Sequence, residues 1–196
     1  MTRAALRAGA ATALTLALAL SAASCRDGSD TSDEPDATAS SAAPKEREAV
    51  TQVTLGKVTG HLPPATGDRL TSEVGDVVDG WVRAAYVDGT YPRRDFADSW
   101  PGFTRGAKAL AHRDRALMSN EDIGERIDGV EPNRIKVRLD VLAVKQRPVG
   151  VTAHVQIGFG TTGDVERQVR IGGRLFLTRS EDGWQVFGYD ISKGAV

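Results

Sequence analysis

The stretch IKVRLDV, residues 135–141, alternates without a break between apolar and charged residues. A period of two places the apolar side chains on one face of a β-strand and the charged side chains on the other. Further strands are expected at residues 151–159, 168–178 and 184–191, with a turn at residues 180–183 joining the last two. Gly172 and Gly173 are expected to bend the strand at residues 168–178. The chain after Pro132 is therefore predicted to form an antiparallel meander.

Before Pro132 the apolar residues recur every three or four positions, which is typical of helices. The first predicted helix has an apolar stripe made by Leu70, Val74, Val77, Val78, Trp81 and Ala85. Thr71 or Ser72 can cap its start, and Gly89 can end it. A second helix is expected to begin after Thr104, its cap, and to continue to about Met118. Its predicted inward-facing residues are Ala107, Leu110, Ala111, Leu117 and Met118.

Three shorter elements complete the prediction. They are a strand at residues 53–62 and single helical turns at residues 95–100 and 123–127. Helices followed by antiparallel strands indicate an α+β fold, in which a curved sheet of four or more strands wraps the helices and forms a cone-like single domain. Residues 50–196 number about 147, a length that suits one domain with one core.

Cys25, the only cysteine, directly follows a short apolar segment. Arg3 and Arg7 provide a positive start, residues 8–23 are uncharged and rich in Ala and Leu, and small residues precede the cysteine. This order is typical of a lipoprotein signal, which predicts a signal peptide at residues 1–24 and lipid attachment to the Cys25 thiol. We therefore expect an exported protein that is anchored at the extracytoplasmic face of the membrane.

Two alternatives to lipidation stay open. Ala22 stands where the lipoprotein motif usually has leucine, so ordinary signal peptidase can also cut at residues 21–23. Retention of the segment as a membrane helix is the other alternative. It is the weaker one, because about 16 apolar residues are fewer than the roughly 20 that span a bilayer.

The next segment is acidic and lacks large apolar residues. Residues 26–49 carry seven acids and three bases and contain no Leu, Ile, Val or aromatic residue. Such a composition cannot bury enough apolar surface to fold, so residues 25–49 are predicted to be the lipidated cysteine and an acidic tether. A tether of this length has an end-to-end distance of roughly 25 to 30 Å, which keeps the domain close to the membrane.

Composition excludes several classes of partner. The chain has a formal net charge of −1 at pH 7, and residues 50–196 alone carry about +1. Nucleic-acid binding requires a basic stripe that a near-neutral domain lacks, so nucleic acid is excluded as a partner. Once Cys25 is acylated, no thiol remains for a disulfide or a metal. His61, His112 and His154 lack metal-ligand spacing, and no cofactor is expected.

Residues 158–163 match the glycine pattern of a dinucleotide-binding loop. That loop must lead into a helix, whose N-terminus holds the pyrophosphate. A strand is expected after these residues instead. We therefore expect the glycines to serve a hairpin turn.

Several short motifs follow one another in this order: Tyr91-Pro92, Phe103-Thr104-Arg105-Gly106-Ala107, Gly173-Arg174-Leu175-Phe176-Leu177 and Gly183 to Asp190. Together with an early helix that carries Trp81, they resemble the nuclear-transport-factor-two-like superfamily over residues 68–193. Within it, the chain is similar to lipid-anchored actinobacterial exported proteins without an assigned activity. The resemblance implies a conical pocket, which isomerases, dehydratases and polyketide cyclases use for catalysis and other members use for binding or scaffolding. Fold alone does not choose among these functions.

Four aromatic residues and one acid are candidates for lining an apolar ligand pocket: Trp81, Tyr91, Trp100, Phe103 and Asp114. The same aromatic residues can equally fill the core. On a helical wheel Asp114 lies between apolar positions and is expected to face inward. Burial would raise the pKa of this carboxyl group and suit it to acid–base catalysis, whereas a buried ion pair or hydrogen bond is the structural alternative.

His154 is the second candidate for a chemical role. It shares the polar face of its predicted strand with Thr152 and Gln156. Because histidine titrates near neutral pH, this side chain can serve in a pocket or at a subunit interface. A solvent-facing position without a function is the alternative.

Three hypotheses follow. We favour an exported lipoprotein whose domain binds a small apolar ligand or an envelope protein without catalysis. The second hypothesis is a pocket enzyme that transfers protons or hydrates a hydrophobic substrate, with Asp114 as base and His154 or a tyrosine as helper. The third is a homodimeric scaffold joined through the outer sheet face, by Lys136, Arg138, Thr152, His154 and Gln156.

Overall fold

The computed structural model describes residues 49–195. The predicted signal peptide, the lipidation site Cys25 and residues 26–48 of the predicted tether lie outside the described residues. The helices are α1 (Pro64–Val82), the π-helical turn η1 (Arg83–Val87), α2 (Arg105–Arg113), α3 (Arg115–Met118) and the 3-10 turn η2 (Gly124–Arg126). The strands are β1 (Gln52–Thr59), β2 (Gly129–Val144), β3 (Arg147–Thr162), β4 (Arg167–Ser180) and β5 (Gly183–Ala195).

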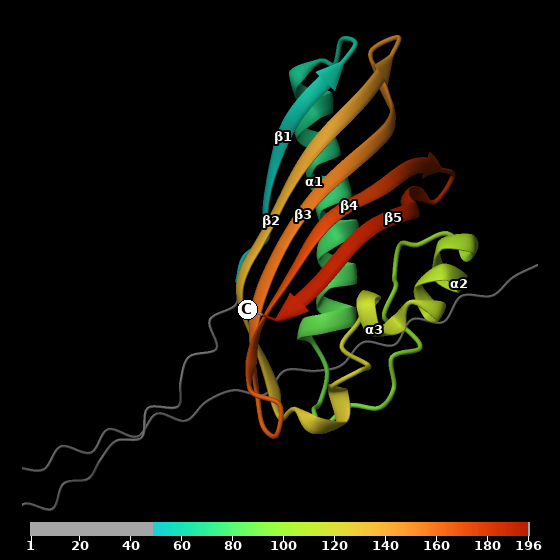
Figure 1. Ribbon diagram of the computed structural model, residues 1–196. Coiled ribbons are helices and arrows are strands. Elements are labelled where there is room, and N and C mark those ends of the chain that lie inside the picture. The colour runs from blue at the N-terminus through green and yellow to red at the C-terminus, as the bar shows by residue number, and fades with distance from the viewer. Residues whose placement is uncertain (1–48, 196) are drawn as a thin grey trace, which may run out of the picture. The chain divides into compact units, whose positions relative to one another are not determined.

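The five strands form one open sheet in the order β1-β2-β3-β4-β5. Strands β2 to β5 pair antiparallel as a meander, which confirms the predicted α+β class and the four predicted strands. Each of them is longer than its alternating sequence pattern indicated. The expected N-terminal strand is also present, as β1, and it pairs parallel to β2 at one edge of the sheet (Figure 1).

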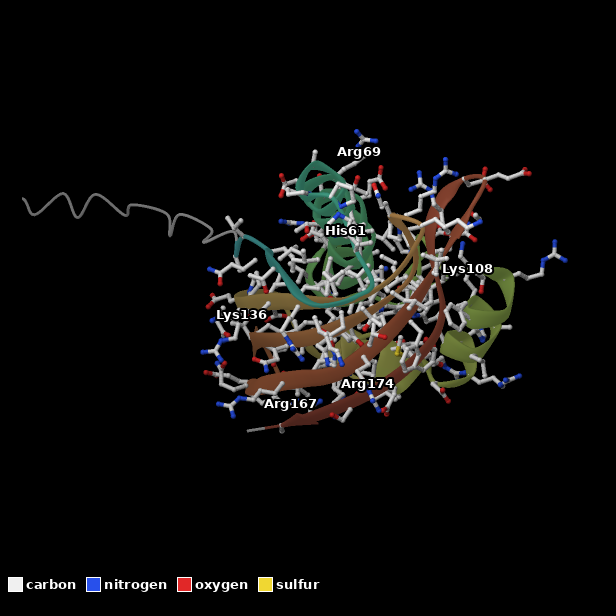
Figure 2. The ribbon with its side chains drawn as sticks, turned by 90° about the horizontal axis from the view of Figure 1, so that it is seen from above. His61, Arg69, Lys108, Lys136, Arg167 and Arg174 are labelled. Atoms are coloured by element: carbon white, nitrogen blue, oxygen red, sulfur yellow. The ribbon has the colours of Figure 1, made fainter. Side chains whose placement is uncertain are left out.

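One face of the sheet is covered by α1, which runs along it, while α2 and α3 lie beside the β5 edge (Figure 1). The apolar side chains at alternate positions of β2 to β5 point to this covered face and form the core with α1, for example Val137, Val155 and Leu175. The opposite, outer face carries the polar residues of the same strands. Seen from above, Lys136 and Arg174 belong to the sheet, whereas Lys108 lies on α2 (Figure 2).

The first helix begins earlier than predicted. It starts at Pro64 after Pro63, rather than at Thr71 or Ser72. Proline favours the first turn of a helix because its φ angle is already helical and its missing N–H has no intrahelical acceptor there. Thr71 lies inside the helix, and its hydroxyl donates to the carbonyl of Gly67 at 2.9 Å. The predicted end is close, because η1 stops at Val87, two residues before Gly89.

The predicted second helix is broken in two. Thr104 caps α2 as expected, and its Oγ1 accepts a hydrogen bond from the Ala107 amide at 3.3 Å. However, Asp114 has φ −96° and ψ 27°, which ends α2 and re-aims the chain before α3. Met118 of α3 is buried as predicted, whereas Leu110, expected to face inward, is 40% exposed. The buried face of α2 is thus narrower than predicted and consists of Ala107 and Ala111.

The two predicted single turns are reduced in length. Residues 95–100 contain only a turn at residues 97–98, where the Asp95 carboxylate accepts the Ala97 amide at 2.9 Å. The turn expected at residues 123–127 is the 3-10 turn η2. Both segments are too short for more than one turn of intrahelical hydrogen bonds. Their backbone conformation therefore depends on side-chain contacts and on the hydrogen bonds of single turns.

Strand β4 depends on Gly173, the second glycine of the predicted bend. Its φ angle is +143°, a conformation that side chains rarely adopt. A Cβ atom at this position would lie 2.1 Å from the backbone oxygen of Asp190 on β5. The close approach of two strand backbones therefore requires glycine here.

We predict that Gly173→Ala lowers the free energy of unfolding by more than about 2 kcal/mol, because a Cβ strains the backbone and pushes β5 away. Gly194→Ala is the matched control, since a Cβ there meets nothing within 4 Å. The control should change stability by less than about 0.5 kcal/mol. Urea unfolding followed by tryptophan fluorescence measures both, and equal effects would contradict the assignment.

Candidate functional site

Three of the four candidate pocket aromatics lie in the hydrophobic core. Trp81, Trp100 and Phe103 are each at most 4% exposed. The Nε1 groups of Trp81 and Trp100 donate to one acceptor, the carbonyl of Met118, at 3.3 and 3.1 Å. The ring of Phe103 packs 6.1 Å from that of Trp81. These side chains contact one another and α3, and the two surface hollows described below are lined by other residues.

Tyr86 completes this arrangement around the end of α3. It is fully buried, and its hydroxyl donates to the carbonyl of Leu117 at 2.7 Å. Burial raises the pKa of this phenol well above its ordinary value. The last carbonyl groups of a helix have no intrahelical donor, so the aromatic N–H and O–H groups satisfy acceptors that would otherwise be buried and unpaired.

The remaining two candidates, Tyr91 and Asp114, are not fully buried. Tyr91 is half-buried and its hydroxyl donates to the carbonyl of Tyr86 at 3.2 Å, and burial raises its pKa. Asp114 was expected to face inward, but it is exposed, as is Leu110 one turn before it, because α2 buries only Ala107 and Ala111. Its Oδ2 accepts a hydrogen bond from the hydroxyl of Tyr189 at 2.8 Å. The pKa of Tyr189 is raised by its partial burial and by that carboxylate.

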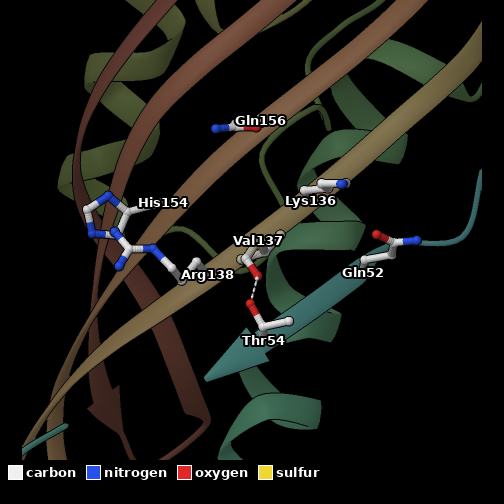
Figure 3. Close-up of a pocket in the computed structure, with 7 residues that line it drawn as sticks. All are labelled: Gln52, Thr54, Lys136, Val137, Arg138, His154 and Gln156. Atoms are coloured by element: carbon white, nitrogen blue, oxygen red, sulfur yellow. Dashed lines mark hydrogen bonds between the residues drawn. The ribbon is translucent and has the colours of Figure 1, made fainter. Parts of the chain in front are cut away.

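A polar hollow lies on the outer face of the sheet, over β1, β2 and β3 (Figure 3). Its volume is about 430 Å³ and it is open to solvent. Apart from Val137, its lining residues form two neighbouring rows across the strands. The first row is Gln52, Lys136 and Gln156, and the second is Thr54, Arg138 and His154. His154 thus lies where the sequence placed it, on the polar strand face beside Gln156.

Asp140 contacts three groups at one end of this hollow. Its Oδ1 accepts the Lys57 amide at 3.0 Å and lies 3.5 Å from Arg138 Nη1, while its Oδ2 lies 2.9 Å from His154 Nε2. The hydrogen bond from the Lys57 amide, followed by those from His154 and the Arg138 charge, lowers the pKa of this carboxyl group. Asp140 therefore remains ionised and fixes the side chains of Arg138 and His154 in the second row.

The edge strand is shaped to reach Asp140. The pairing of β1 with β2 slips between Leu55 and Val58, and this irregularity contains Gly56 and Lys57. A Cβ atom on Gly56 would lie 2.5 Å from Asp140 Oδ1. A β-bulge leaves one backbone amide without a partner strand, so that this amide can bond to a side chain. Beyond the second row, the β1 group that meets Asp140 is therefore the Lys57 backbone amide and not a side chain.

A second hollow, of about 380 Å³, lies near the end of the sheet beside α3. Its central side chain is Lys193, whose Nζ donates to the carbonyls of Ala116 and Ser119 at 2.9 and 2.7 Å and to Asp122 Oδ1 at 2.6 Å. Burial lowers the pKa of this amine. All three of its N–H donors are occupied by the protein, so Lys193 acts here as a structural cap of α3.

The described residues hold no group of three or more His, Cys, Asp or Glu side chains arranged to bind a metal ion. Between residues 49 and 195, no helix has the combination of length and apolar character that crossing a bilayer needs. The glycine pattern at residues 158–163 is followed by β4 and not by a helix. Of its glycines, Gly158 and Gly160 lie within β3, and Gly163 alone serves the turn, with φ +101°.

No protein-family model matches the chain, and no match was found among the curated proteins or the solved structures. The arrangement of its own residues therefore carries the functional argument. Sequence reasoning identified Lys136, Arg138, His154 and Gln156 as one polar face, but it missed Gln52, Thr54 and Asp140. The charge of Asp140 in the alternating stretch was a signal for a polar cluster, whereas nothing local indicates that β1 pairs with β2.

The outer hollow yields a prediction about pH. A carboxyl group whose pKa is lowered by folding stabilises the protein above its unfolded pKa of about 3.9, and this contribution is lost as the pH falls through the folded pKa. We therefore expect Asp140→Asn to destabilise the protein at about pH 6 and to have a much smaller effect at about pH 3.

Asp76→Asn, at an exposed position of α1, is the matched control for this experiment. It should change the free energy of unfolding similarly at the two pH values. Urea unfolding of both variants and of the unchanged protein measures the differences. An Asp140→Asn effect that is independent of pH would show that its ionised form is not what the fold uses.

The aromatic cluster yields a second prediction. Tyr86→Phe removes only the hydroxyl group that serves the buried carbonyl of Leu117, and it should lower the free energy of unfolding by about 1 to 3 kcal/mol. Tyr189→Phe makes the same chemical change where the partner is the exposed Asp114, and should cost less than about 1 kcal/mol. Thermal and urea unfolding followed by circular dichroism compare the two. A cost for Tyr86→Phe no larger than the control would contradict a structural role.

Proposed function

We propose that this chain is an exported lipoprotein whose domain at residues 50–196 binds a ligand or partner outside the membrane without catalysing a reaction. The observation that carries the proposal is Cys25, the only cysteine, placed directly after an apolar run of small residues and before an acidic segment. Acylation at this position and the tether that follows it would hold the domain at the extracytoplasmic face. We also propose that the domain is a nuclear-transport-factor-two-like cone, which its α-helix-covered, mostly antiparallel sheet supports.

Lipid attachment would give the single cysteine of the chain a function. Each methylene buried in the bilayer contributes about 0.8 kcal/mol, and one acyl chain gives only marginal binding. Two or three chains on an N-terminal cysteine therefore anchor a protein stably. The domain needs no membrane-spanning helix of its own to stay at the membrane.

Binding is favoured over catalysis by the positions of the candidate residues. Asp114, the candidate base, is exposed and hydrogen-bonded to Tyr189. Trp81, Trp100 and Phe103 are buried in the core, where two of them serve the carbonyl of Met118. The polar hollow on the outer face instead presents its side chains to solvent, as a binding surface does.

The anchor is tested by expressing the full chain in a bacterium with the lipoprotein pathway. The mature protein should begin at residue 25, incorporate labelled palmitate and enter the detergent phase on phase separation, because acyl chains attach to the Cys25 thiol and the new amino terminus. Cys25→Ser should abolish both the label and the acyl mass. Intact mass spectrometry of the mature N-terminus measures the modification directly.

Ser29→Ala, four residues further along the predicted tether, is the matched control and should behave as the unchanged protein does. A mature protein with a free N-terminus after residue 23 or 24 and no acyl mass would overturn the proposal in favour of simple secretion. Retention of residues 1–24 in the mature protein would overturn it in favour of a membrane helix.

A further inference from the structure

We propose that the outer-face hollow binds a small, soluble anion through its carboxylate or phosphate oxygens. This inference rests on the proposed binding function and names the chemical class of the ligand. It departs from the apolar ligand expected from the sequence, because the aromatic residues that suggested such a ligand are core residues, whereas the open hollow is lined by polar and cationic side chains.

The first row of the hollow supplies hydrogen-bond donors that the protein does not use. Gln52, Lys136 and Gln156 stand side by side on β1, β2 and β3. Within residues 49–195 none of these three side chains makes a hydrogen bond or an ion pair. An ammonium group has three N–H donors and each amide group has two, so the row presents a cation flanked by neutral donors. Anionic oxygens are the acceptors that such a row fits best.

The second row adds a guanidinium group at the correct spacing. Arg138 follows Lys136 by two residues on the same strand face, which places their Cα atoms roughly 6.5 to 7 Å apart. Arg138 lies 3.5 Å from Asp140 through Nη1, so its other N–H donors stay available. A guanidinium group binds carboxylate or phosphate oxygens in pairs, while the nearby ammonium group adds charge.

The nearest carboxylate, that of Asp140, balances only one of the two positive charges, because its ion pair is with Arg138 and not with Lys136. Asp140 is already occupied by the Lys57 amide, His154 and Arg138. In the next position of the second row, Arg174 on β4 pairs with Asp190 on β5, so the row continues as a neutral pair. Lys136 is therefore the uncompensated charge of the hollow. It has no anionic partner among the described residues, and a ligand oxygen could take that place.

The size of the hollow selects a small molecule. A volume of about 430 Å³ falls in the range of roughly 300 to 1,000 Å³ that holds small ligands. A nucleic acid or other long polyanion requires a basic stripe, whereas Lys136 and Arg138 are the only Lys or Arg residues that line the hollow, and its second row ends at the Arg174–Asp190 pair. The position is open to solvent, which suits reversible binding of a soluble metabolite.

The test uses the full chain purified in neutral detergent and isothermal titration calorimetry with three probes: inorganic phosphate, citrate and glucuronate. At least one probe should bind, with an affinity that falls as salt concentration rises, because partly exposed charges are screened. The double variant Lys136→Gln/Arg138→Gln should weaken that binding at least tenfold. Circular dichroism confirms that each variant is folded.

The matched control is Arg105→Gln/Lys108→Gln, which removes the same two charges from exposed positions of α2. Lys108 lies on another side of the domain from Lys136 (Figure 2), so this control should bind the probe as the unchanged protein does. Equal weakening in both double variants would overturn the site in favour of general charge attraction. Failure of all three probes to bind at low salt would overturn the small-anion assignment.

A further arm separates a soluble anion from a lipid headgroup. Binding of the Cys25→Ser chain to phosphatidylglycerol vesicles but not to phosphatidylcholine vesicles, without binding of any free probe, would overturn the proposal in favour of a membrane surface. Failure of this inference is distinguishable from failure of the proposed function, because the acyl mass on Cys25 is measured separately. A lipidated protein that binds none of the probes loses only the anion site.

Discussion

Four consecutive carbonyl groups at the end of α3, those of residues 116–119, accept hydrogen bonds from side chains of distant elements. Lys193 of β5 serves Ala116 and Ser119, Tyr86 of η1 serves Leu117, and Trp81 and Trp100 serve Met118. A helix of four residues has almost no intrahelical bonds to hold it, so these donors fix its position. These donors join α3 to α1, to η1, to Trp100 in the segment before α2, and to β5. For this reason large aromatic side chains fill the place where a ligand pocket was expected.

This use of the aromatic residues determines which surface remains for function. Burying an aromatic side chain removes roughly 150 to 250 Å² from water, which stabilises the fold by about 4 to 6 kcal/mol at about 25 cal/mol per Å². A core that depends on Trp81, Trp100 and Tyr86 in this way cannot open to a ligand without losing both that burial and the hydrogen bonds of α3. The covered face of the sheet therefore serves stability, and the outer face carries the exposed polar chemistry.

The sequence predicted the fold class and the four meander strands because alternation with a period of two is a local signal, clearest in residues 135–141 and 151–159. It failed where position depends on distant contacts. Asp114 was placed inward because the wheel grouped it with Leu110, but α2 buries only Ala107 and Ala111 against the rest of the domain. The hairpin between β2 and β3 gave no signal either, because Lys145 and Gln146 adopt positive φ angles of 49° and 64° where glycine or asparagine is usual.

Half of the candidate site was visible in the sequence and half depends on one strand pairing. The alternation placed Lys136, Arg138, His154 and Gln156 on a common face, but two rows become a hollow only when β1 adds Gln52 and Thr54. Parallel partners need a long crossover, and here residues 60–128 separate β1 from β2, so no local pattern specifies their register. At the Gly56–Lys57 irregularity the Lys57 amide bonds to Asp140, which in turn contacts His154 and Arg138, so the register of β1 and the position of these side chains depend on each other. A change in the pairing of β1 would therefore alter the hollow before it altered the core.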